Sequence, residues 1–253
     1  MSGRREEDAA KTAAAARKGA GANLPKRFYQ AATIDQRANG FAVLLDGKSM
    51  RTPSRKPLVV PSRAIADAIA AEWSAQVALI DPATMPMTRL VNSTLDGVAG
   101  QEAEVAADAA KYAGSDLLCY RAHSPEALVM MQCMAWDPVL AWAESVHGWR
   151  FAKSVGVAYV TQPPKTLQDV SKTISRFDAF ALAGLHAMTT LMGSVLLAVA
   201  VAQRHMTAEA AWAAAHVDED FQIRQWGEDA EAAARRAFRW RDMQAAAMLV
   251  AGK

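Results

Sequence analysis

The sequence has few cysteines and none of the short motifs that hold metals or phosphates. Its two cysteines, Cys119 and Cys133, fit neither a zinc site nor a disulfide framework. Both are flanked by apolar residues, so we expect small buried thiols in a reducing compartment. The five histidines include no HExxH pair, and no glycine-rich phosphate loop or GxSxG motif occurs. We therefore predict no metal, no cofactor and no catalytic residue.

Charge imbalance and long apolar runs are also lacking. The chain carries 28 Lys and Arg against 26 Asp and Glu, so a nucleic-acid partner is not expected. The longest apolar stretch, residues 191–202, is far shorter than the roughly twenty residues of a membrane span. We expect a buried helix there and no membrane insertion. Residues 1–25 lack the apolar core of a signal peptide and contain acids, so we expect a disordered polar tail on a cytoplasmic protein.

The 56 alanines, the strongest helix formers, predict a mostly helical protein. Residues 26–61 are the exception, with extended runs over 27–29, 41–45, 48–52 and 58–60 and a hairpin turn at Asp46-Gly47. From Ser62 onward the apolar spacing is helical. The sequence therefore predicts an α+β fold with a small antiparallel β domain over residues 26–61 and a larger helical domain over residues 62–253.

Local capping and breaking residues predict several element boundaries. One helix is expected from Asp178 to residue 205, and another from Thr207 to Trp226, where Gly227 ends it. Asp137-Pro138 has the form of a helix start. Residues 85–87 are expected to form an extended connector, because the residue before a proline disfavours the helical region.

The segment from residue 211 to residue 229 contains the most informative pattern. Spacings of four and three residues predict one shared helix face for five side chains, namely Trp212, His216, Glu219, Ile223 and Trp226. A carboxylate within such a stripe must be paired, protonated or exposed, because burying it unpaired costs several kcal/mol. One interpretation is an internal salt bridge from Glu219 to Arg89 or Arg121, or an exposed edge residue. The other is an acid on an aromatic surface that receives a cationic group of a partner. For Trp226 itself, core packing is the default expectation.

At these residues the sequence resembles a known family, the ATP-twelve family of assembly chaperones for the alpha subunit of the F-one sector of ATP synthase. The resemblance covers about residues 26 to 240 and consists of short runs in the family's order. These runs are Arg27-Phe28-Tyr29, Leu45-Asp46-Gly47-Lys48, Arg51-Thr52-Pro53, Pro61-Ser62, Glu72-Trp73 with Gln76, Met85-Pro86-Met87-Thr88, Asp116 to Arg121, Trp136-Asp137-Pro138, Asp218-Glu219, Phe221-Gln222 and Trp226-Gly227-Glu228-Asp229.

The resemblance implies a chaperone without catalysis or cofactor that binds the free alpha subunit and protects its interface until the beta subunit replaces it. The family's acidic motif matches Glu219, and the expected partner-binding residues are Glu219, Asp220, Gln222 and Trp226. Trp73 is expected to be structural. We expect a monomer in the bacterial cytoplasm, or in the mitochondrial matrix if the source is eukaryotic. A small-molecule enzyme of unrecognised chemistry is the alternative.

Overall fold

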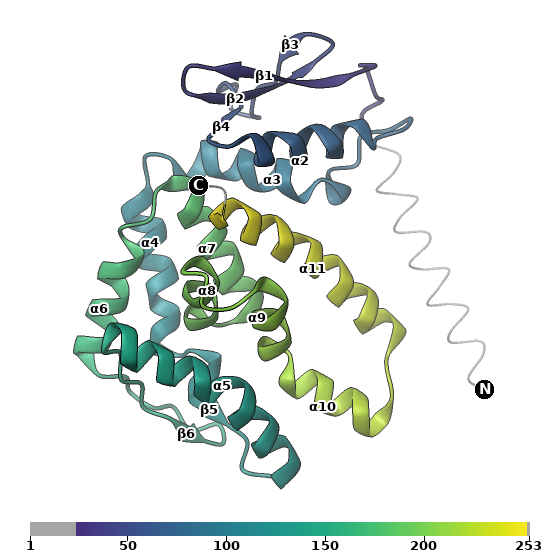
Figure 1. Cartoon of the computed structure of the whole chain (residues 1–253). Coiled ribbons are helices and arrows are strands. Elements are labelled where there is room, and N and C mark those ends of the chain that lie inside the picture. Colours follow the sequence, from purple (N-terminus) through teal and green to yellow (C-terminus); the bar gives the residue numbers. More distant parts are fainter. Residues whose placement is uncertain (1–23, 252–253) are drawn as a thin grey trace, which may run out of the picture.

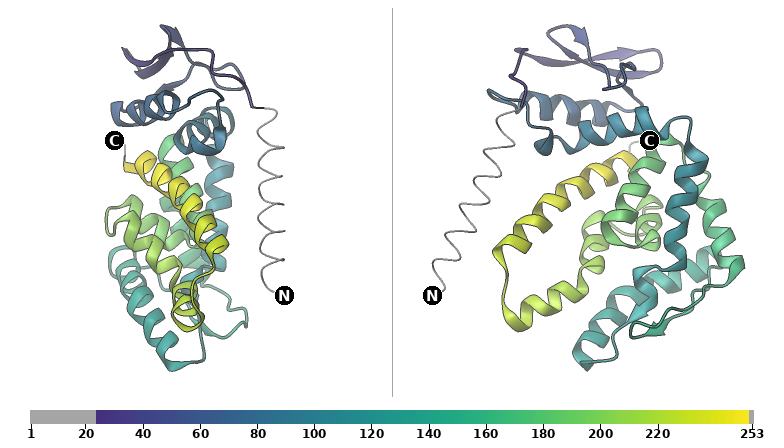
Figure 2. Two further views of the ribbon diagram at one scale, coloured as in Figure 1. Left: turned by 90° about the vertical axis from the view of Figure 1, so that its right-hand side faces the viewer. Right: turned by 180° about the vertical axis from the view of Figure 1, so that it is seen from behind.

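The computed structural model describes residues 24–251 and shows a small sheet at one end of a larger set of helices (Figure 1). The sheet lies with α2 (Arg63–Ser74) and α3 (Pro86–Ser93) at this end, and α5 (Glu126–His147) and α10 (Val217–Trp226) reach the opposite end (Figure 2). This arrangement confirms the predicted α+β, mostly helical fold class. The tail predicted over residues 1–25 lies, up to residue 23, outside the described residues.

The sheet is built around a central strand, β2 (Gly40–Leu45), which pairs antiparallel with β1 (Ala32–Arg37), β3 (Lys48–Ser49) and β4 (Val59–Val60). Asp46 and Gly47 both have positive φ, as a two-residue type I′ turn requires, so the predicted hairpin turn is confirmed. The first strand begins at Ala32 rather than at Arg27. The guanidinium of Arg27 instead donates to backbone carbonyls, including that of Gln30 at 2.8 Å, and anchors this segment outside the sheet.

The helices α2 and α3 share a buried cluster with the sheet, which includes Val43, Leu58, Ile65, Ile69 and Val91. Contrary to the expected extended connector, α3 begins at Pro86. The carboxylate of Glu72, on α2, accepts hydrogen bonds from the backbone N–H groups of Met87 at 2.6 Å and Thr88 at 2.8 Å, and so caps this helix. The cluster joins residues on both sides of the predicted boundary at residue 61, and the division into two domains stays a prediction.

The helical part contains a short parallel pair of strands, β5 (Tyr120–Arg121) and β6 (Ser154–Val155), near α5. The other helices of the described chain are α4 (Glu102–Lys111), α6 (Pro164–Ile174), α7 (Ala179–Met192), α8 (Val195–Ala202), α9 (Ala208–Ala215) and α11 (Ala230–Ala251).

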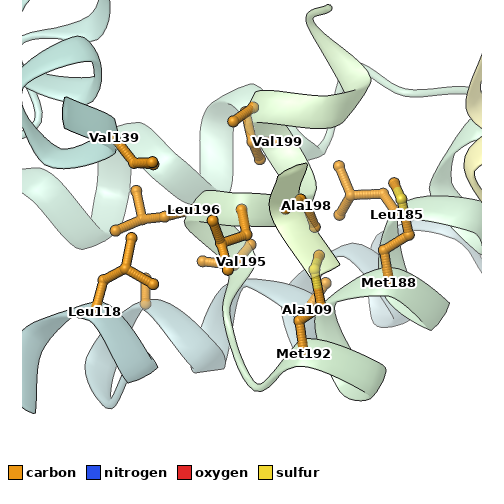
Figure 3. Close-up of a cluster of buried hydrophobic side chains, with 14 of the residues drawn as sticks. Ala109, Leu118, Val139, Leu185, Met188, Met192, Val195, Leu196, Ala198 and Val199 are labelled. Carbon is orange, nitrogen blue, oxygen red and sulfur yellow. The ribbon is translucent and has the colours of Figure 1, made fainter. Parts of the chain in front are cut away.

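The centre of the helical part is α8, whose residues from Val195 to Ala200 are all buried (Figure 3). A helix that is apolar on every side must be surrounded by protein. Asp116, itself fully buried, fixes the start of α8 by accepting hydrogen bonds from the Ser194 hydroxyl at 2.8 Å and the Leu196 N–H at 3.1 Å. Close by, α7 and α11 touch at Gly184, where an added Cβ would lie 2.6 Å from the Ala246 carbonyl oxygen.

Two of the helices predicted as continuous are interrupted. Between residues 178 and 205, Gly193 takes a positive φ and ends α7, and Ser194 caps α8. Between residues 207 and 226, His216 leaves the helical region and separates α9 from α10. Conversely, the predicted helix start at Asp137-Pro138 is wrong, because Pro138 lies inside the continuous helix α5.

Among residues 24–251 no helix has both the length and the apolar character needed to cross a membrane. Cys119 is buried, as expected for a small core thiol. Cys133 is exposed on α5, so the expectation of a buried thiol is wrong there.

Candidate partner-binding groove

An open groove of about 770 Å³ lies between α9 and α10 on one side and α11 on the other. The loop of residues 227–229 connects the end of α10 to the start of α11 (Figure 1). We call this site the α10–α11 groove. Its lining comprises Glu209, Trp212, Ala213, Glu219, Gln222, Ile223, Trp226, Gly227, Glu228, Asp229, Ala232, Ala233, Arg236, Ala237 and Trp240.

Three of the four predicted partner-binding residues line this groove, namely Glu219, Gln222 and Trp226. They come from one face of α10, as the spacing of three and four residues predicts. Trp212 contributes from α9, and its ring lies 5.6 Å from that of Trp240 across the groove on α11. Four of the five side chains of the predicted stripe therefore line the groove, whereas His216, at the break between α9 and α10, is buried. The second wall of the groove comes from α11.

Glu219 has an exposed carboxylate, with 58% of its side chain accessible. The internal partners considered for it are engaged elsewhere, since Arg89 contacts Asp242 at 2.5 Å and Arg121 contacts Asp137 at 2.8 Å. The interpretation as an internal salt bridge to either arginine is therefore wrong.

His216 is the nearest basic side chain to Glu219, at 3.9 Å. Burial lowers the pKa of His216, so its imidazole is neutral at pH 7. Its Nδ1–H donates to the Trp212 carbonyl at 2.7 Å, which leaves Nε2 without a proton to donate to Glu219. The carboxylate consequently faces the groove without a cationic partner among residues 24–251.

Asp220 does not line the groove, because its carboxylate is paired with Arg236 of α11. Both side chains are largely covered, at 33% and 25% exposure. The pair connects α10 to α11 and places the guanidinium of Arg236 in the groove wall with its charge already compensated. The structure therefore gives Asp220 a role in holding the groove together.

Trp226 is 79% exposed, so the default expectation of core packing is wrong for this residue. It stands at the end of α10, where Gly227 with a positive φ turns the chain toward α11. An isolated exposed tryptophan is unusual on a surface because its ring carries a large apolar area. Gln222, also exposed, lies one turn before it.

Sequence reasoning missed the α11 wall and the acidic rim. Glu228 and Asp229 stand in the turn between the helices, and Glu209 stands on α9, so three further acids surround the apolar floor. Asp229 also caps α11 by accepting from the Ala232 N–H at 2.9 Å. The spacing of four residues between Ala232, Arg236 and Trp240 was the available signal for the second wall.

Residues 24–251 contain no group of three or more His, Cys, Asp or Glu side chains that could hold a metal ion. The groove instead combines exposed apolar surface, which includes Trp226, with carboxylates such as that of Glu219 that have no cationic partner among the described residues. The fold and the groove thus define a mostly helical protein with a small β-sheet at one end and an open, acid-rimmed groove beside α10.

Comparison with known proteins gives the family. Residues 26–144 match the model of the ATP12 chaperone protein family. The crystal structure of Atp12 from Paracoccus denitrificans is 40% identical, with a TM-score of 0.81, and the match covers 89% of this chain and 97% of that one. A candidate chaperone from Agrobacterium tumefaciens is 48% identical, with a TM-score of 0.85, over 90% of this chain and 86% of that one. The chain belongs to the ATP12 chaperone family.

Proposed function

We propose that the protein binds the free alpha subunit of F-type ATP synthase through the α10–α11 groove and shields it until the beta subunit takes its place. One observation carries this proposal: the same open groove is lined by an exposed Glu219 without a cationic partner and by an exposed Trp226. Membership of the ATP12 chaperone family supports a role in protein assembly. The proposed setting is the bacterial cytoplasm or, in a eukaryote, the mitochondrial matrix, with the chaperone as a monomer.

A ring subunit without its neighbour exposes apolar interface surface, and such surface promotes aggregation. A chaperone for it must cover the apolar area yet release it when the final partner arrives. A groove with an apolar floor and an acidic rim meets both needs. The floor supplies contact area, and the solvent-accessible charges give selectivity and fast exchange more than tight binding.

The test uses the purified chaperone and an alpha subunit diluted from denaturant, with light scattering as the measure of aggregation. The wild-type chaperone is expected to suppress scattering at stoichiometric concentration. The variant Glu219→Lys places a cation where a basic group of the client is expected, so suppression should be lost. Because Glu219 is exposed, this variant should keep the wild-type circular dichroism spectrum and melting temperature.

The matched control is Glu104→Lys, which makes the same charge change at an exposed position on α4, away from the groove. It is expected to suppress aggregation like the wild type. If Glu219→Lys protects the alpha subunit as well as the control does, the groove is not the docking site. If the wild type fails to protect the alpha subunit at all, the proposed client is wrong.

A further inference from the structure

A second cavity, of about 580 Å³, lies where the sheet meets α2 and α3, at the opposite end of the molecule from α10 (Figure 1). We call it the sheet pocket. Its wall contains residues from several of the short runs that resemble the ATP-twelve family but do not line the α10–α11 groove. These runs lie far apart along the chain. These residues are Phe28 and Tyr29, Leu45, Asp46 and Lys48, Arg51 to Pro53, and Trp73, together with Ser49, Met50 and Asn92.

The apolar part of the sheet pocket is aromatic and preorganised. The rings of Tyr29 and Trp73 lie 5.4 Å apart, and the Tyr29 hydroxyl donates to the Trp73 carbonyl at 2.7 Å. Phe28 packs edge-on against Tyr29 at 5.4 Å, yet 72% of Phe28 is exposed. A large apolar side chain is therefore held at the rim with most of its area exposed.

The charged part of the rim is basic. Lys48 and Arg51 are exposed, and neither forms an ion pair with a carboxylate among residues 24–251. The guanidinium of Arg51 donates only to the carbonyl of Arg55, at 2.9 Å. The one acid that lines the pocket, Asp46, already accepts hydrogen bonds from the backbone N–H groups of Gln30 and Ala31. Both cations thus remain outside any ion pair, and Lys48 lies close enough to Asp46 to help lower the pKa of that carboxyl group.

Unsatisfied polar atoms are also concentrated here. The described residues contain three fully buried side-chain polar atoms without a hydrogen-bond partner, and two of them, Trp73 Nε1 and Asn92 Oδ1, belong to residues that line the sheet pocket. One is a donor and the other an acceptor. Native proteins rarely leave such atoms unpaired.

We infer that the sheet pocket binds an acidic peptide segment, in which a large apolar side chain packs against the cluster of Phe28, Tyr29 and Trp73 and a neighbouring carboxylate contacts Lys48 and Arg51. This inference deepens the proposed function, because the segment would belong to the same client that the α10–α11 groove holds. The two sites have opposite charge, with an acidic rim at the groove and a basic rim at the pocket. A client bound at both ends would be held in one orientation, since reversing it would oppose like charges.

The pocket is tested directly by NMR on the full-length ¹⁵N-labelled protein. Each of the seven tryptophans carries one indole N–H group, and the variant Trp73→Phe identifies the signal from Trp73 by its loss. The probe is a capped Gly-Phe-Glu-Glu-Gly peptide, compared with Gly-Phe-Lys-Lys-Gly and Gly-Ser-Glu-Glu-Gly. The acidic phenylalanine peptide is expected to shift the Trp73 indole signal saturably. The two comparison peptides should each bind at least about tenfold more weakly, because each lacks one of the two contacts.

Variants of the rim connect this binding to the named residues. The double variant Lys48→Glu, Arg51→Glu should bind the acidic peptide at least about tenfold more weakly, because attraction becomes repulsion. Phe28→Ala should also weaken it. Both variants change exposed side chains, so wild-type melting temperatures are expected. The control is Lys172→Glu, at an exposed cation of α6 outside both sites, and it should bind like the wild type.

Three outcomes would overturn the inference: no shift of the Trp73 signal by the acidic peptide at millimolar concentration, equal binding of the lysine peptide, or unchanged binding by the double variant. The alpha-subunit assay separates this failure from that of the proposed function. If Glu219→Lys abolishes protection while the double variant protects fully and binds no peptide, the groove stands and the pocket fails. If the wild type gives no protection but the acidic peptide binds at Trp73, the client assignment fails and the pocket stands.

Discussion

Trp226 offers a sharp test of the groove, because its contribution to folding and its contribution to binding should differ widely. The side chain is 79% exposed in the free protein. A fully buried tryptophan covers roughly 150–250 Å², so docking a client on Trp226 would remove up to about 120–200 Å² of additional surface from water. At about 25 cal/mol per Å² this corresponds to roughly 3–5 kcal/mol as an upper bound. Hot-spot tryptophans typically contribute about 2–4 kcal/mol.

The variant Trp226→Ala should therefore weaken alpha-subunit binding by roughly 30- to 1000-fold, since each 1.4 kcal/mol is about a factor of ten. The free energy of unfolding should change by less than about 1 kcal/mol, because little of the ring is covered in the free protein. Binding is measured by biolayer interferometry with immobilised chaperone, and unfolding by urea titration of the same preparations.

The matched control is Tyr159→Ala, which removes an aromatic ring of similar exposure, 70%, outside the groove. It should leave both quantities unchanged. The reasoning is refuted if the two variants bind the alpha subunit equally well. It is also refuted if Trp226→Ala loses several kcal/mol of folding stability, because the ring would then be a packing element.

Three further predictions concern the framework that positions the groove. Gly184→Ala should lower the free energy of unfolding by about 1–2 kcal/mol in urea titration, because the new methyl would lie 2.6 Å from the Ala246 carbonyl oxygen and push α11 from α7. Glu72→Gln should also lower the free energy of unfolding by about 1–2 kcal/mol, because one of the carboxylate oxygens that cap α3, the one bonded to Thr88, is replaced by a hydrogen-bond donor. An unchanged melting temperature would contradict the capping role. Burial raises the pKa of Asp116 to about 6 in the folded protein. The protonated carboxyl group therefore stabilises the fold fully at a pH below the pKa of this residue in the unfolded chain, and this stabilisation is lost as the pH rises through about 6. Between pH 5 and pH 7 the free energy of unfolding of the wild type, from urea titration, should fall by about 1 kcal/mol relative to that of Asp116→Asn. Parallel pH profiles of the two proteins would show that burial does not raise this pKa.

The parts of the fold that depend on local chemistry could be predicted from the sequence. The turn at Asp46-Gly47 needs positive φ at both residues, and these residue types tolerate it. The spacing of Glu219, Ile223 and Trp226 placed three side chains on one face, and the structure puts all three in the groove. Both signals are contained within a few residues of chain.

Several of the errors arose where distant residues decide the local structure. The start of α3 at Pro86 depends on Glu72, which lies on another helix. The α10–α11 groove needs Arg236 of α11 to pair with Asp220 of α10, and the pattern of α10 alone cannot indicate that. The sheet pocket was not predicted, because Phe28, Trp73 and Asn92 come together only in the folded chain.

Hydrogen exchange of the complex tests the central claim most directly, because it reports on the backbone of the groove itself. The chaperone is labelled in deuterated buffer alone and with the alpha subunit, and its peptic fragments are compared by mass spectrometry. We expect the bound client to slow exchange in residues 217–240, which form α10, the turn and the first half of α11, and to leave α6 unchanged. A complex that forms with no slowing over residues 217–240 would contradict the account.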